Sequence, residues 1–108
     1  MYTTRVTWEP LRSIDSALLT GVIFHSLGTP LAFPSYKCKM VNNSNVLVLV
    51  SIDGVTAIDV CPPNSFWLYD EAITKPYEAL PANTQIFVKA ATPGTGLIYL
   101  VTQYIIQG

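Results

Sequence analysis

Short apolar runs and two-residue alternation dominate this sequence, and helical spacing is nowhere sustained over about 11 residues. Val46–Val50 (VLVLV) is an unbroken run rich in β-branched residues, which is typical of a strand covered on both faces. Ser35–Val41 alternates, with Cys38 and Met40 on one side and lysines on the other. The expected strands are Ala17–Leu27, Ser35–Val41, Val46–Val50, Val55–Val60, Ser65–Asp70, Thr84–Ala90 and Leu97–Ile106.

Turn-forming residues lie between these segments. The dipeptide Asp53-Gly54 adopts positive φ at little cost, so it predicts a two-residue hairpin turn of type I′ between the two central strands. Asn42–Asn45 (NNSN) predicts a second turn, because short amide side chains mimic backbone hydrogen bonds. For Ala17–Leu27, a short helix over the SALL portion is the alternative to a strand, and Glu71–Ala79 is predicted to be a loop.

Evenly spaced short strands predict an all-β fold, a small antiparallel β-sandwich that is jelly-roll-like or barrel-like. Residues 17–108 would form this single domain. Residues 1–16 are polar and contain Pro10, which a central strand does not accommodate. We therefore predict that they form an extended N-terminal arm or an edge strand, with Trp8 as its anchor against a partner.

The low content of charged residues predicts that another molecule covers part of the surface. Only 12% of the 108 residues are charged, against about 25% in an ordinary domain. The net charge of −1 leaves no basic stripe, so specific nucleic-acid binding is not expected. No apolar run approaches the ~18 residues of a membrane span, and Glu9 and Asp15 interrupt any signal peptide. The chain is therefore expected to fold in a cytoplasm, with no membrane partner.

The reactive residue types are few and scattered. Cys38 and Cys61 lack metal-site spacing, so we interpret them as small apolar side chains in or near the core, with a bridge formed in an oxidising medium as the alternative. His25 is the only histidine and adjoins no nucleophile turn. Asp59 and Asp70 are the candidates for a hydrolytic pair of carboxylates, although acids commonly solvate strand ends. We expect no catalytic residues, no metal and no cofactor.

Aromatic residues carry the remaining functional signal. Trp67 and Tyr69 share one face of their strand and could form a sugar-stacking platform, but aromatic residues in strands mostly pack into cores or interfaces. The last strand is apolar on both faces, which favours a subunit buried in an assembly. The predicted core or contact residues are Trp8, Phe66, Trp67, Tyr69, Tyr99, Val101 and Tyr104.

Several segments together resemble small minor virion structural proteins of tailed bacteriophages. They are LGTPL (27–31), NNSN, SIDGV (51–55), PPNSFWLYD and LPANTQIFVKAATPGTGLIYLVTQY. The resemblance covers most of the chain after Leu27 and rests on turn and strand chemistry, so it carries no catalytic residues. It implies a β-sandwich subunit of the virion, at the head–tail neck or on the capsid. Its partners would be further copies of itself and capsid, portal or connector proteins.

Three functions are therefore compared below. The first is the non-enzymatic virion structural protein, located in the virion after folding in the host cytoplasm. The second is a carbohydrate-binding, host-recognition module that uses Trp67 and Tyr69. The third is a small hydrolase that uses Asp59 and Asp70, which requires both carboxyl groups in one cleft.

Overall fold

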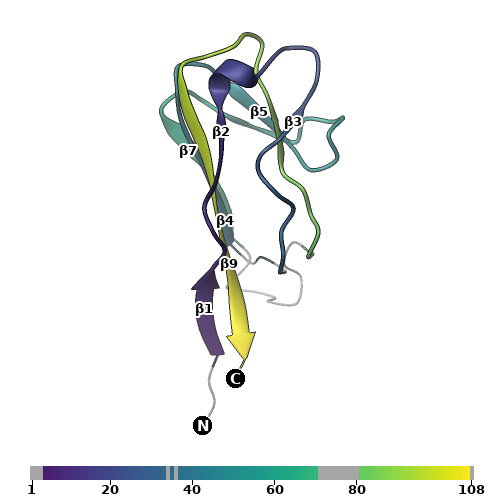
Figure 1. Ribbon diagram of the computed structural model, residues 1–108, viewed down its shortest axis with the longest axis vertical. Coiled ribbons are helices and arrows are strands. Elements are labelled where there is room, and N and C mark those ends of the chain that lie inside the picture. Colours follow the sequence, from purple (N-terminus) through teal and green to yellow (C-terminus); the bar gives the residue numbers. More distant parts are fainter. Residues whose placement is uncertain (1–3, 34, 36, 71–80, 108) are drawn as a thin grey trace.

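The computed structural model describes residues 4–33, 35, 37–70 and 81–107, and these form a β-sandwich of two antiparallel sheets (Figure 1). Within the described residues there is no α-helix, only the single 3-10 turn η1 (Ser16–Leu18). The strands are β1 (Thr4–Trp8), β2 (Arg12–Asp15), β3 (His25–Ser26), β4 (Lys37–Ser44), β5 (Val48–Ser51), β6 (Asp59–Cys61), β7 (Ser65–Asp70), β8 (Phe87–Lys89) and β9 (Gly96–Gln107). The predicted all-β sandwich is confirmed.

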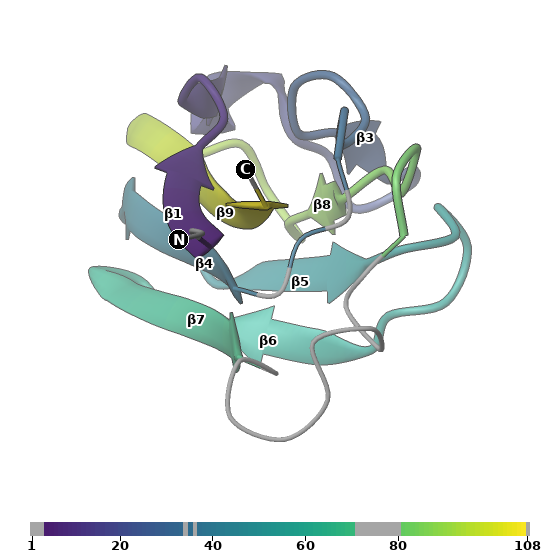
Figure 2. The same ribbon diagram turned by 90° about the horizontal axis from the view of Figure 1, so that it is seen from below.

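The two sheets are built from interleaved parts of the chain (Figure 2). The five-stranded sheet has the order β1-β9-β4-β7, with β2 also paired to β9, and the four-stranded sheet has the order β3-β8-β5-β6. Apolar side chains from both sheets meet between them and exclude water, which is the main stabilising term in such a fold. The fully buried core includes Leu19, Leu27, Met40, Val48, Val50, Val88, Ile98 and Leu100.

The long strand β9 joins the sandwich to a protruding part of the five-stranded sheet. Its residues 96–103 pair with β4, and its residues 97–100 pair with β2 on the other side. Its residues 103–107 pair with β1, and residues 104–107 lie beyond the end of β4. We call Thr4–Trp8 together with Gln103–Gln107 the ribbon; it extends away from the sandwich in Figure 1 and contributes to overall dimensions of 51 × 23 × 22 Å. The predicted arm or edge strand thus supplies β1 and β2.

The central hairpin is present, but the prediction of a two-residue turn at Asp53-Gly54 is wrong. Strands β5 and β6 pair from Val48 with Cys61 to Val50 with Asp59, so residues 52–58 form the connection. The Asp53 carboxylate accepts hydrogen bonds from the Val55 and Thr56 N–H groups at 2.8 and 2.7 Å. These bonds widen the turn, and Gly54 supplies the positive φ of 79° within it.

The predicted turn at NNSN is also wrong, because β4 continues through Asn42 and Asn43 to Ser44. Asn42 is fully buried, and its amide nitrogen donates to the carbonyl oxygens of Val46 and Cys61 at 2.8 and 2.9 Å. The Asn42 side chain therefore links β4 to the segment that follows it and to β6 through hydrogen bonds inside the core. The alternation of buried positions begun at Cys38 simply continues to Ser44.

The remaining strand predictions vary in accuracy. Ser65–Asp70 is confirmed as β7, and Leu97–Ile106 lies within β9. Most of the strand predicted over residues 17–27 is absent: Asp15 caps η1 by accepting from the Ala17 N–H, and only His25 and Ser26 are extended and paired. The strands predicted at 55–60 and 84–90 are the shorter β6 and β8. The loop predicted at 71–79 lies outside the described residues.

Candidate interaction surface

The five-stranded sheet has an apolar side that faces away from the second sheet. Along β9, Ile98, Leu100 and Thr102 are buried, so Tyr99 and Val101 point to the opposite side. Strand pairing brings residues of β4 and β7 level with them on that side. We call this the outer face; it comprises the apolar or aromatic residues Trp8, Val41, Phe66, Leu68, Leu97, Tyr99 and Val101 and the polar residues Ser13, Asp15, Lys37, Lys39, Asn43 and Gln103.

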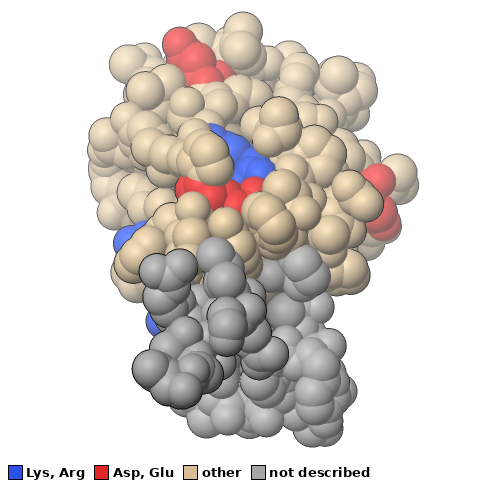
Figure 3. Space-filling view, turned by 60° about the horizontal axis from the view of Figure 1, so that its bottom comes forward, with Lys and Arg blue, Asp and Glu red and all other residues tan. Residues whose placement is uncertain are grey.

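Three large apolar side chains of the outer face are highly exposed. Phe66 is 61% exposed, Trp8 58% and Leu68 49%. The solvated face of an antiparallel sheet normally carries polar residues, so this one is unusual. On the side that Figure 3 draws, the described surface is mostly uncharged, with one adjoining group of basic and acidic atoms near its centre and smaller charged patches at its edges. A surface with large exposed apolar side chains and two lysines, Lys37 and Lys39, suits docking against another protein better than it suits a reaction.

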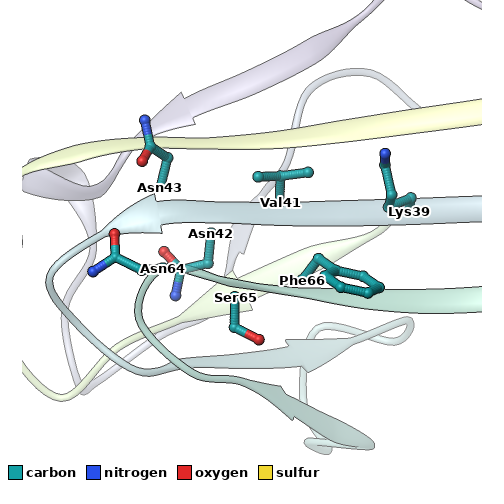
Figure 4. A pocket seen from close by; sticks show the side chains of 7 residues that line it. All are labelled: Lys39, Val41, Asn42, Asn43, Asn64, Ser65 and Phe66. Carbon is teal, nitrogen blue, oxygen red and sulfur yellow. The ribbon is translucent and has the colours of Figure 1, made fainter.

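A pocket of about 440 Å³ lies at one end of the outer face (Figure 4). In Figure 4, Lys39 and Val41 project from β4 on one side, and the Phe66 ring lies on the neighbouring β7. Asn43 and Asn64 bring amide groups to the opposite end of the pocket. The pocket thus combines an aromatic ring, one cation and several hydrogen-bonding groups. It is lined by Lys39, Val41, Asn42, Asn43, Asn64, Ser65 and Phe66.

The two aromatic residues of the predicted sugar platform do not both lie on this face. Trp67 pairs with Met40, is half-buried and packs against the core, and its indole Nε1 donates to the Asp59 carboxylate at 2.6 Å. The side chain of Tyr69 lies outside the described residues. The exposed aromatic side chain of β7 is Phe66, because successive side chains in a strand point to opposite faces.

The other predicted contact residues are divided between the two faces of the five-stranded sheet. Tyr99 and Val101 are half-buried on the outer face, and Trp8 is exposed beside them on the ribbon. Tyr104 is half-buried on the inner side, where its ring stacks on Phe33 with centroids 4.1 Å apart and an interplanar angle of 13°. Four of the predicted core or contact residues, Trp8, Phe66, Tyr99 and Val101, therefore lie on the outer face.

A buried ion pair, which the sequence did not reveal, fixes the ribbon to the sandwich. The Arg12 guanidinium donates to the Glu9 carboxylate at 2.6 Å, and both residues are only 7% exposed. Arg12 also donates to the carbonyl oxygens of Thr29 at 2.7 Å and Pro30 at 3.0 Å, and to the Thr102 hydroxyl at 3.3 Å. We call Glu9, Arg12 and these partners the junction network.

The Glu9 carboxylate is held in its ionised form. Burial opposes ionisation, but the hydrogen bond from Arg12 and those from the Ala32 and Phe33 N–H groups outweigh it, so the pKa of Glu9 lies below its usual value. Gly28, at φ +72°, passes so close to Arg12 that an added Cβ would lie 2.6 Å from the arginine Cβ. In the sequence, Glu9 and Arg12 are only an acidic and a basic residue three positions apart, because their other hydrogen-bond partners are distant along the chain.

The candidate reactive groups are separated or already engaged. Cys38 and Cys61 are free and buried, and burial raises the pKa of Cys38 to about 12 and also raises that of Cys61. The Asp59 carboxylate accepts from Trp67, and the side chain of Asp70 lies outside the described residues. His25 Nε2 is buried without a hydrogen-bond partner among the described atoms. In the described part of the chain, no three His, Cys, Asp or Glu residues gather as metal ligands.

No protein-family model matches this chain, and no curated protein is significantly similar to it. Across the described residues, no helix has the length and apolar character needed to cross a membrane. The case for a function therefore depends on the outer face, the ribbon and the pocket.

Proposed function

We propose that this protein is a non-enzymatic structural subunit of a tailed-bacteriophage virion. It would assemble at the head–tail neck or on the capsid, through contacts with further copies of itself and with capsid, portal or connector subunits. The observation that carries the proposal is the exposed apolar outer face, in a chain with only 12% charged residues. The resemblance of the turn and strand segments to small virion proteins supports the choice of particle.

The outer face supports assembly because water would otherwise cover large apolar side chains. Burying apolar surface yields about 25 cal/mol per Å², so Phe66, Leu68 and Trp8 would each contribute substantially once a neighbour covers them. A surface of aromatic and aliphatic residues with few charges is the composition found at the centre of stable protein interfaces. The buried cysteines and the engaged Asp59 leave these apolar residues as the main functional feature.

The size of the protein in solution, measured by light scattering over a range of concentrations, tests self-assembly. The wild-type chain should be oligomeric, and the double variant Phe66→Ser/Leu68→Ser should remain folded but shift to monomer. Val55→Ser is the matched control, since Val55 is 81% exposed but lies in the β5–β6 connection. A wild-type chain that stays monomeric at high concentration contradicts the proposal, as does a parent particle whose electron-microscopy map has no density for the subunit.

A carbohydrate-binding module is the second candidate. Its sugar site would be the pocket of Figure 4, in place of the platform predicted at Trp67 and Tyr69. The Phe66 ring could stack on the apolar side of a sugar while Asn43 and Asn64 bond to its hydroxyl groups. Binding to a glycan array that is lost in Phe66→Ala and retained in Trp8→Ala would support this function. An absence of binding across the array would remove it.

A further inference from the structure

We propose that the two edges of the five-stranded sheet join in the assembly, with β1 of one copy pairing to β7 of the next. The inference rests on the self-assembly proposed above and specifies its contact. The strand order places β1 and β7 at opposite edges of the sheet in the described part of the chain. The sheet would then continue from subunit to subunit through main-chain hydrogen bonds, which is recognition by strand addition.

The ribbon is the part of the molecule that most needs such a partner. Residues 104–107 of β9 lie beyond the end of β4, and they pair with β1. A pair of strands alone is at best marginally stable in water, and the described side-chain contact on the inner side of the ribbon is the stack of Tyr104 on Phe33. A third strand along β1 would provide the missing main-chain bonds.

The hydrogen-bond pattern shows which backbone groups β1 offers. In an antiparallel pair the residues alternate, so that every second residue bonds to the partner strand and the others point away. The Glu9 N–H donates to the Thr102 carbonyl at 3.1 Å, which extends the register in which Thr7 pairs with Tyr104. Odd-numbered residues of β1 therefore bond to β9. The N–H groups of Thr4, Val6 and Trp8 point outward.

The same reasoning applies to β7. The Asn45 N–H donates to the Thr95 carbonyl at 3.3 Å, so odd-numbered residues of β4 bond to β9 and even-numbered ones bond to β7. Met40 pairs with Trp67, so Trp67 bonds to β4. The backbone groups of Phe66 and Leu68 consequently point outward from the edge of the sheet.

The directions of the strands suit a head-to-tail contact. Each neighbouring pair along β1-β9-β4-β7 is antiparallel, so the first and last strands of this path run in opposite directions. Two copies in the same orientation would therefore bring β1 and β7 together as an antiparallel pair. A contact between two different surfaces of one subunit propagates around a ring or along a filament.

The side chains at these edges are complementary as well. Trp8 pairs with Gln103, which places it on the outer face together with Phe66 and Leu68. If Trp8 lies opposite Phe66 of the neighbouring copy, the antiparallel register places Val6 opposite its Leu68. Each residue whose backbone groups point away from one edge then faces such a residue on the other edge. Three of the exposed large apolar residues of the outer face would then come together in one cross-strand cluster.

The substitution Val6→Pro tests the contact, because proline lacks the outward N–H but is accepted in an edge strand whose N–H faces solvent. We expect a folded chain whose dissociation constant for self-assembly, measured by analytical ultracentrifugation, rises by about tenfold or more. Ser13→Pro is the matched control: Arg12 and Ile14 bond to β9, so the Ser13 N–H also points outward, but from β2 and outside the ribbon. It should leave assembly unchanged.

The outcomes separate this inference from the proposed function. Assembly weakened by Val6→Pro and by Leu68→Pro, with Ser13→Pro unaffected and near-ultraviolet circular dichroism unchanged throughout, supports the β1–β7 contact. A wild-type oligomer that both Val6→Pro and Leu68→Pro leave intact overturns the contact and retains self-assembly. A monomeric wild-type chain overturns both. Should Leu68→Pro fail to fold, Val6→Pro with its Ser13→Pro control still decides.

Discussion

The two halves of β9 have similar sequences but different surroundings. Residues 96–103 have a partner strand on each side over most of their length and a second sheet beneath them, and Leu100 is only 1% exposed. Residues 104–107 continue the largely apolar sequence and pair with β1, and Tyr104 is half-buried against Phe33. An apolar sequence of this kind therefore predicts a strand, but the elements packed around the strand decide whether its side chains are buried.

The junction network lies where the two halves meet. Arg12 reaches the Thr102 hydroxyl on β9 and the carbonyl oxygens of the loop at Thr29 and Pro30, while Glu9 binds Arg12 and the following N–H groups of that loop. The polypeptide passes from β1 to β2 at this point, so the ion pair holds the base of the ribbon. A rigid base lets the ribbon be positioned for a partner before one is bound.

Hydrogen exchange should show the largest difference between the halves. In the monomer, amides of residues 97–103 should exchange through global unfolding, on the order of 10³-fold or more slower than those of Tyr104 and Ile106, which open locally. The measurement requires a dilute sample or the Val6→Pro variant, since assembly would protect the ribbon. Equal protection in both halves would mean that the ribbon is as stable as the sandwich.

Breaking the junction network should cost the most stability. Arg12→Ala leaves the Glu9 carboxylate buried without its cation, and a loss of about 3–5 kcal/mol in the free energy of unfolding is expected from denaturant titration. The double variant Glu9→Gln/Arg12→Met removes both charges and should lose less. If the double variant is the less stable of the two, the unpaired charge is not the cause.

Truncating one inward-facing side chain in each half of β9 compares the two environments directly. Leu100→Ala creates a cavity in the core and should lower the free energy of unfolding by about 2–5 kcal/mol. Tyr104→Ala removes a stacked pair on a half-buried ring, and the loss should be on the order of 1 kcal/mol. Thermal or urea unfolding of both variants measures this, and similar losses would contradict the distinction.

The smallest effect concerns pH. The pKa of Glu9 is lower in the folded chain than its ordinary value near 4.5, so the contribution of Glu9 to stability is present above that value and is lost as the pH falls through the folded pKa. Wild type should therefore lose stability more steeply than Glu9→Gln below about pH 4.5. Asp53, whose pKa is lowered to about 2 chiefly by the Thr56 and Val55 N–H groups, loses its own contribution in a window extending to lower pH.

Much of the architecture could be predicted from local pattern. The alternation along β4 and the aromatic β7 were visible in the sequence, and so was the long apolar β9. Asn42 was assigned to a turn because asparagine favours turns, yet the carbonyl oxygens of Val46 and Cys61 satisfy its amide inside the core. Those partners come from other elements, so residue type alone could not reveal them.

The surface was harder to predict than the fold. Trp8, Phe66, Tyr99 and Val101 were predicted to be core or contact residues, but only the strand register places Trp8 on the same side as Phe66. The loop at Asp53 was predicted too short because one carboxylate caps successive amides. Arg12 gave no signal, since its acceptors include main-chain oxygens of a loop that has no strand pattern.

The two natural thiols have a practical consequence. The thiolate is the reactive form of cysteine, and with a pKa of about 12 only on the order of one Cys38 in 10⁴ is ionised at pH 8. Cys61 is buried as well. A fluorophore or spin probe attached through a cysteine added at a solvent-facing position would thus mark that position selectively, and distances between labelled positions could be measured without removing either natural cysteine.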